Sequence, residues 1–110
     1  MNRITFTTPK GEEYVAEFNL DTVSSMEERH LTPADVATAP ATNMKRFFYW
    51  SFKMHHPKVK QSDTDMLWEG LSSEGKETVI SKLGEFWMEA QNALMDEPED
   101  DSKKVTWEIG

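Results

Sequence analysis

His55 and His56 are the residues best suited by type to chemistry, because paired histidines can bind a metal ion or act as a general base. Adjacent residues of a helix project about 100° apart, so the two rings cannot approach one ion as an i,i+4 pair would. The nearest acid downstream is Asp63, and no HExxH spacing occurs. We therefore interpret the pair as histidines near a helix end, where the negative end of the helix dipole favours them.

The sequence carries no other catalytic signature. Cysteine is absent, which excludes disulfides, zinc–thiolate sites and a thiol nucleophile and fits a reducing cytosol. No serine stands in a GxSxG elbow, and the glycines do not form a GxGxxG or phosphate-binding loop. The acidic run Glu97–Asp101 lacks the spaced ligands and the glycine of an EF-hand. We predict that the protein is not an enzyme and needs no metal or cofactor.

Charge is distributed unevenly along the chain, whose formal net charge is −8. This sign argues against binding to a phosphate backbone, which depends on Lys and Arg. Acids dominate from Gln61 onward, whereas the block from Val36 to Ser62 contains no Asp or Glu. The basic residues of that block are Lys45, Arg46, Lys53, Lys58 and Lys60. The asymmetry is compatible with self-association of opposite faces or with a partner of both signs, although solvated faces are the commoner explanation.

Aromatic residues are abundant for a chain this polar. Those at helical spacing are expected to fill the core, namely Phe47, Phe48, Phe52, Phe86 and Trp87. Trp50, Trp68 and Trp107 are better interface candidates, because tryptophan and tyrosine anchors concentrate binding energy, although a core role stays open for each. The predicted partner-binding residues are Lys45, Arg46, Tyr49, Trp50, Lys53, Trp68 and Trp107.

The elements that position these residues begin with a β-hairpin. Arg3–Thr7 and Glu13–Phe18 alternate apolar with polar residues and flank a turn at Thr8–Gly11. An isolated hairpin is marginal until one face packs against something, so helices must cover it.

Two short helices are expected next. Asp21 or Thr22 can cap a helix that runs through Arg29. Thr32 can cap a second helix, with Pro33 at its first position, that ends near Pro40. The central helix is expected at Met44–His55, capped by Thr42 or Asn43 and stopped by Pro57, because proline cannot donate a backbone hydrogen bond.

The C-terminal half predicts two more helices. Ser62 with Asp65 resembles a capping box that opens a short helix, in which Met66, Leu67 and Leu71 are the apolar positions. The longest periodic run is Glu74–Asp96, where apolar residues recur at three- and four-residue steps.

These signals predict an α+β fold, predominantly α-helical, in which an N-terminal β-hairpin packs on four or five helices. We expect one globular domain over residues 1–96 and a flexible acidic tail over residues 97–110. The apolar end of that tail, Val105–Ile109, is β-prone and needs a docking site. No run approaches the roughly 20 apolar residues that span a bilayer, and the N-terminus lacks a secretory signal, so we expect a soluble cytoplasmic protein.

The order of these features resembles the short tail assembly chaperones of siphophages and related prophages. That family begins with a hairpin carrying G-x-x-Y-x-x-x-F and a helix with V-x-x-M-E-E-R. An aromatic helix and a His-containing loop follow, then a short helix with L-x-E-x-L, and an acidic spacer before a closing V-x-W-E. The matching positions are Gly11, Tyr14 and Phe18, then Val23–Arg29, Leu67–Leu71 and Val105–Glu108. The chain departs from the family at Ala37–Asn43, which is more interrupted by proline.

The resemblance implies a non-catalytic protein that binds the hydrophobic tape measure protein before the tail tube polymerises. Such proteins act in the bacterial host cytoplasm and are absent from the mature virion. The major tail protein and a second copy of the chain are further partners to consider, whereas nucleic acid and membranes are not expected. Two alternatives stay open. One is a structural phage component, such as a head–tail connector or minor tail protein, and the other is a small inhibitor or regulator of a host protein.

Overall fold

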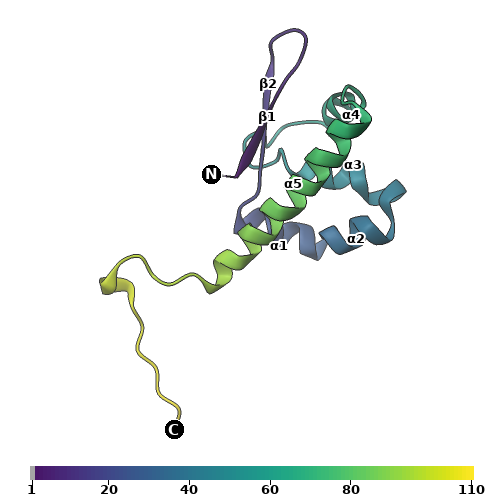
Figure 1. The fold of residues 1–110 in the computed structure, drawn as a ribbon. Coiled ribbons are helices and arrows are strands. Elements are labelled where there is room, and N and C mark those ends of the chain that lie inside the picture. The colour runs from purple at the N-terminus through teal and green to yellow at the C-terminus, as the bar shows by residue number, and fades with distance from the viewer. Residues whose placement is uncertain (1) are drawn as a thin grey trace.

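The computed structural model describes residues 2–110 and has an α+β architecture that is predominantly helical, as predicted (Figure 1). An N-terminal hairpin of two antiparallel strands is followed by five α-helices. The elements are β1 (Arg3–Thr7), β2 (Glu13–Glu17), α1 (Leu20–Glu28), α2 (Pro33–Thr38), α3 (Pro40–Trp50), α4 (Gln61–Glu69) and α5 (Ser73–Asn92). Short 3-10 turns lie at Ala93–Met95 and Asp101–Lys103.

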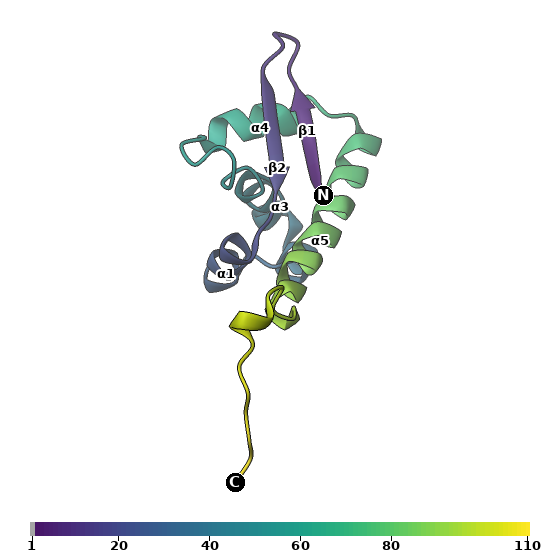
Figure 2. The same ribbon diagram turned by 90° about the vertical axis from the view of Figure 1, so that its left-hand side faces the viewer.

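The hairpin forms where the alternating pattern predicts it. Its register pairs Arg3 with Glu17 at one end and Thr7 with Glu13 at the other. The turn between the strands contains Gly11, whose φ of +85° lies in the left-handed region that favours glycine. This turn projects beyond the helices that support the rest of the hairpin (Figure 2).

The first two helices differ in how well their caps were predicted. Helix α1 begins earlier than expected, because the Asn19 side chain, rather than Asp21 or Thr22, accepts a hydrogen bond from the Thr22 N–H at 2.8 Å. Helix α2 is capped as predicted. The Thr32 hydroxyl accepts from the Asp35 N–H, and the Asp35 carboxylate accepts from the Thr32 N–H at 2.9 Å.

The predicted central helix, Met44–His55, is shifted toward the N-terminus. Helix α3 occupies Pro40–Trp50, and the chain continues from Ser51 through His55 as turns. The prediction was wrong because Pro40 starts this helix instead of only ending the previous one. Proline suits the first helical position, where its missing N–H would have no partner.

Helices α4 and α5 lie near their predicted places with different ends. The Asp63 carboxylate accepts the Lys60 N–H at 3.3 Å, so α4 begins at Gln61 and the proposed Ser62–Asp65 box is not used. Helix α5 is capped by Ser72, whose hydroxyl oxygen accepts from the Gly75 N–H at 3.0 Å. It is the longest helix, but its regular part ends at Asn92 rather than Asp96.

An aromatic cluster joins the hairpin to the helices. The Phe48 ring lies 5.5 Å from Phe6 of β1, 4.9 Å from Phe52 and 5.1 Å from Trp68 of α4, measured between centroids. Of the predicted core aromatics, Phe47, Phe48, Phe52 and Trp87 are buried and Phe86 is partly buried. The hairpin is therefore held by the same side chains that pack α3 against α4.

The C-terminal residues lie outside this packing. Residues 97–110 are all exposed, and they lead away from the C-terminal end of α5 (Figures 1 and 2). Val105–Ile109, predicted to be β-prone, pairs with no strand of the described chain. Within residues 2–110, no helix is long and apolar enough to cross a membrane.

Candidate partner-binding surfaces

The end of α3 and the turn after it form an aromatic–basic surface, which we define as Arg29, Tyr49, Trp50 and Lys53. The guanidinium of Arg29 lies 4.7 Å from the centre of the Trp50 ring. The Lys53 ammonium lies 5.6 Å from the same ring and 5.0 Å from the ring of Tyr49. Cations over aromatic faces are attracted by the ring quadrupole, so the four side chains hold one another in place.

Both rings are also held in place by contacts with the rest of the domain. Trp50 is half-buried and packs against the hydrophobic core. The Tyr49 hydroxyl donates a hydrogen bond to the Val59 carbonyl at 3.2 Å. A partner that contacts these rings would therefore pay little conformational entropy to order them.

Lys45 and Arg46, the two other basic residues predicted to bind a partner, differ in their contacts. Lys45 forms an ion pair with Glu69 of α4, with Nζ and Oε1 3.2 Å apart. Helix α4 thus brings an acid next to the basic block, which the linear order of residues did not indicate. Arg46 is exposed and makes no ion pair with any described residue.

The structure separates two of the predicted anchors from this surface. Trp68 is buried against Phe48 as part of the core, so its prediction as an accessible anchor was wrong. Trp107 is 80% exposed, but it lies on the tail, away from α3. Arg29 was missed by sequence reasoning, because it is the C-cap residue of α1 and only the tertiary fold places it on Trp50.

A second surface is an apolar groove of about 660 Å³ between the hairpin and α4. We call it the hairpin–α4 groove. Its apolar lining includes Phe6, Met66, Leu67 and Leu71, and its charged lining residues are Lys10, Glu12 and Asp63. Met66 is 73% exposed, which is unusual for a residue of this kind beside a core. No sequence signal indicated this groove, because its walls lie far apart in the chain.

The hairpin edge beside this groove is open. On β2, the N–H groups of Val15 and Glu17 point away from β1, to the ring of His56 and the carbonyl of Ser51. Thr5 of β1 lies opposite Val15, and in an antiparallel pair both residues at such a position direct their backbone groups outward. The outward groups of Thr5 therefore have no strand partner among the described residues.

Both histidines contact the second strand of the hairpin. The Nε2 atom of His56 accepts a hydrogen bond from the Val15 N–H at 2.9 Å. The Nε2 atom of His55 lies 2.7 Å from a carboxylate oxygen of Glu17. Within residues 2–110, no group of three or more His, Asp or Glu is placed to hold a metal ion.

Tyr14 connects the groove to the loop at His56–Lys58, since it lines both hollows. Burial, followed by the nearby carboxylates of Glu12 and Asp63, raises the pKa of the Tyr14 phenol.

Comparison with protein families identifies one family for this chain. A domain of unknown function, DUF5055, matches residues 1–110. The chain belongs to the DUF5055 family. No curated protein and no solved structure matches it.

Proposed function

We propose that this DUF5055 protein is a non-catalytic bacteriophage tail assembly chaperone. It binds the tape measure protein in the host cytoplasm before the tail tube polymerises and does not remain in the mature virion. The ordered resemblance along the chain supports this assignment. The observation that carries it is the aromatic–basic surface, where Tyr49 and Trp50 are partly exposed and are held in position by Arg29 and Lys53.

This surface matches the chemistry of the proposed client. A long helical protein with an apolar seam aggregates when alone, and a soluble module that covers the seam prevents this. The Trp50 ring offers an apolar contact in a fixed orientation. Arg46 and Lys53 offer charges at the rim, where they steer encounter with acidic flanks of the seam more than they hold the complex.

Replacing the central aromatic tests the proposal. Trp50→Ala should weaken client binding by about 2 kcal/mol or more, the effect expected of a hot spot. Because Trp50 also packs on the core, we expect a modest fall in melting temperature, so binding is measured well below the transition. The readout is the soluble fraction of the tape measure protein when the two are co-expressed. A folded Trp50→Ala variant that solubilises the client as well as the parent does would show that this surface is not the client site.

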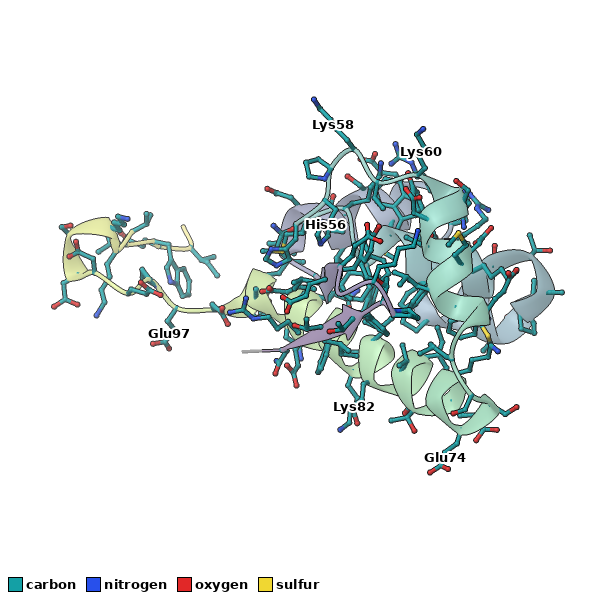
Figure 3. The ribbon with its side chains drawn as sticks, turned by 90° about the horizontal axis from the view of Figure 1, so that it is seen from above. His56, Lys58, Lys60, Glu74, Lys82 and Glu97 are labelled. Carbon is teal, nitrogen blue, oxygen red and sulfur yellow. The ribbon has the colours of Figure 1, made fainter. Side chains whose placement is uncertain are left out.

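A charge variant gives a second test at a residue that does not pack on the hydrophobic core. Lys53→Glu should slow association with the client, and the effect should shrink as salt is raised. Lys82→Glu is the matched control, since Lys82 is exposed on α5 and its reversal gives the same net charge (Figure 3). Equal effects of the two variants would indicate a general charge effect. Finding the protein in purified virions by mass spectrometry would indicate instead a structural component of the particle.

A further inference from the structure

We propose that the C-terminal segment Val105–Ile109 of one copy adds as a third strand to the open edge of β1 in a second copy. Its apolar side chains would then enter the hairpin–α4 groove. The inference concerns self-assembly and does not depend on the identity of the client. Three observations carry it: an unpaired edge, a strand-like segment without a partner, and a tail that leads away from the hairpin of its own chain.

The edge offers backbone groups in the pattern that a new strand needs. Thr5 and Thr7 alternate with Phe6, whose backbone groups pair with Tyr14 of β2. The outward groups of the two threonines have no strand partner in the described chain, and both residues are exposed. Open edges of this kind readily accept a strand from another chain.

The C-terminal segment has the matching composition. In an extended chain Val105, Trp107 and Ile109 share one face, while Thr106 and Glu108 share the other. The three apolar side chains are 86%, 80% and 87% exposed, respectively. Such exposure of three large apolar residues in a row of five is costly unless a partner covers them.

A strand added at the β1 edge would continue both faces of the hairpin. One face of β1 carries Phe6 and lies toward the helices, and the groove beside it is lined by Met66, Leu67 and Leu71 of the α4 region. The apolar face of the added segment would lie over these residues. The polar face, with Glu108, would lie toward solvent.

The geometry favours a second copy over the same chain. The groove adjoins the N-terminal end of α5, where Leu71 lies, whereas the tail leaves at the C-terminal end (Figure 1). A helix as long as α5 spans about 30 Å. The spacer of residues 96–104 spans at most about 30 Å when fully stretched, and the turn at Asp101–Lys103 shortens it. In the structure the tail leads away from the hairpin, so docking within one chain would need the spacer to fold back along α5, whereas docking between chains would not.

Charge complementarity also points to contact between copies. Lys58 and Lys60 project from the loop before α4, while Glu97 lies on the tail at the far end of the molecule (Figure 3). The loop adjoins the groove, since Tyr14 and Asp63 line hollows on both sides. The acidic spacer of one copy can therefore meet the basic loop of the next. Because groove and tail lie at opposite ends, repeated contacts would build a head-to-tail chain or a ring.

Sedimentation velocity of the full-length protein over a broad concentration range tests the proposal. The average mass should rise with concentration. Trp107→Ser should weaken association by about 30-fold or more, the effect of losing a hot spot. Glu108→Ser is the matched control, since its side chain lies on the opposite face, and it should associate as the parent does. A protein that stays monomeric at every concentration, or a Trp107→Ser variant that associates normally, overturns the proposal.

A mixing experiment distinguishes docking between chains from docking within one chain. Thr5→Pro removes an edge N–H that the hairpin does not use, and proline is tolerated at such edge positions. The Thr5→Pro variant has a blocked β1 edge and an intact tail segment. The Trp107→Ser variant has an open β1 edge and a tail segment that binds weakly. Each variant alone should be monomeric, and an equimolar mixture should form a heterodimer. If the mixture stays monomeric, or if residues 105–109 are protected from hydrogen exchange in a monomer, the proposal is wrong.

A surface variant covers the case in which Thr5→Pro fails to fold. Met66→Glu places a charge in the groove at an exposed position and should abolish association without lowering the melting temperature. Met88→Glu is its control, because Met88 is also exposed but does not line the groove. Association that is equally sensitive to both variants would refute the groove as the docking site.

Discussion

At the scale of residues, the Asp35 carboxylate stabilises the start of helix α2. Hydrogen bonds from the backbone N–H and the hydroxyl of Thr32 hold the pKa of Asp35 below its usual range. A carboxyl group whose pKa is lowered on folding stabilises the folded state above its unfolded pKa, and this contribution is lost as the pH falls through the folded value.

We therefore expect Asp35→Asn to lower the melting temperature at neutral pH. The difference from the parent should shrink as the pH is lowered below about 4, where the carboxyl group becomes protonated. The backbone N–H of Ser102 likewise lowers the pKa of Asp100, but Asp100 lies in the exposed tail. Asp100→Asn should therefore leave the melting temperature unchanged, and thermal unfolding of both variants across this pH range checks the assignment.

At the scale of elements, substitution of two glycines by alanine should have opposite effects on stability. Gly84 lies within α5 beside an apolar hollow, and a Cβ added there would meet nothing within 4 Å. Gly84→Ala should stabilise the protein by about 1 kcal/mol, because alanine favours a helix and the added methyl group meets no steric clash. Gly11→Ala should destabilise the protein by a similar amount, because φ at this position is +85°. Denaturant titrations in which both substitutions raise, or both lower, the free energy of unfolding relative to the parent would contradict this account.

Much of the element order followed from local patterns. Alternation placed the hairpin, and periodicity placed the long helix α5, because both signals are contained within a few residues. Local patterns failed at Pro40, which can end one helix or begin the next. They also failed at Trp68, since only packing against Phe48 decides whether this ring faces the core or solvent. The hairpin–α4 groove could not be predicted, because its walls are joined only by tertiary folding.

At the scale of the molecule, the tail is separate from the core. Residues 97–110 are exposed throughout, so deleting them should change the melting temperature little when the protein is dilute. A large fall in melting temperature after the deletion would instead show that residues 97–110 pack on the domain. Circular dichroism of the shortened chain decides this.

Unfolding should also be indifferent to chelator. The sequence has no cysteine, and the two adjacent histidines are engaged by the hairpin rather than by one another. A metal bound only by the folded state would stabilise it by mass action. A large drop in melting temperature after chelation would therefore reveal a site that the described residues do not suggest.

The hydrogen bond from Val15 to His56 has a consequence for synthesis. The two residues are separated by 41 positions, so the hairpin leaves the ribosome long before the segment that closes its second strand. Until His56 has emerged, both edges of the nascent hairpin are available for pairing. We expect ribosome-bound chains that end before His56 to be cut readily by protease within the hairpin. The Val105–Ile109 segment is translated after all the helices of the domain, so head-to-tail assembly can begin only from chains whose helical domain has already been synthesised.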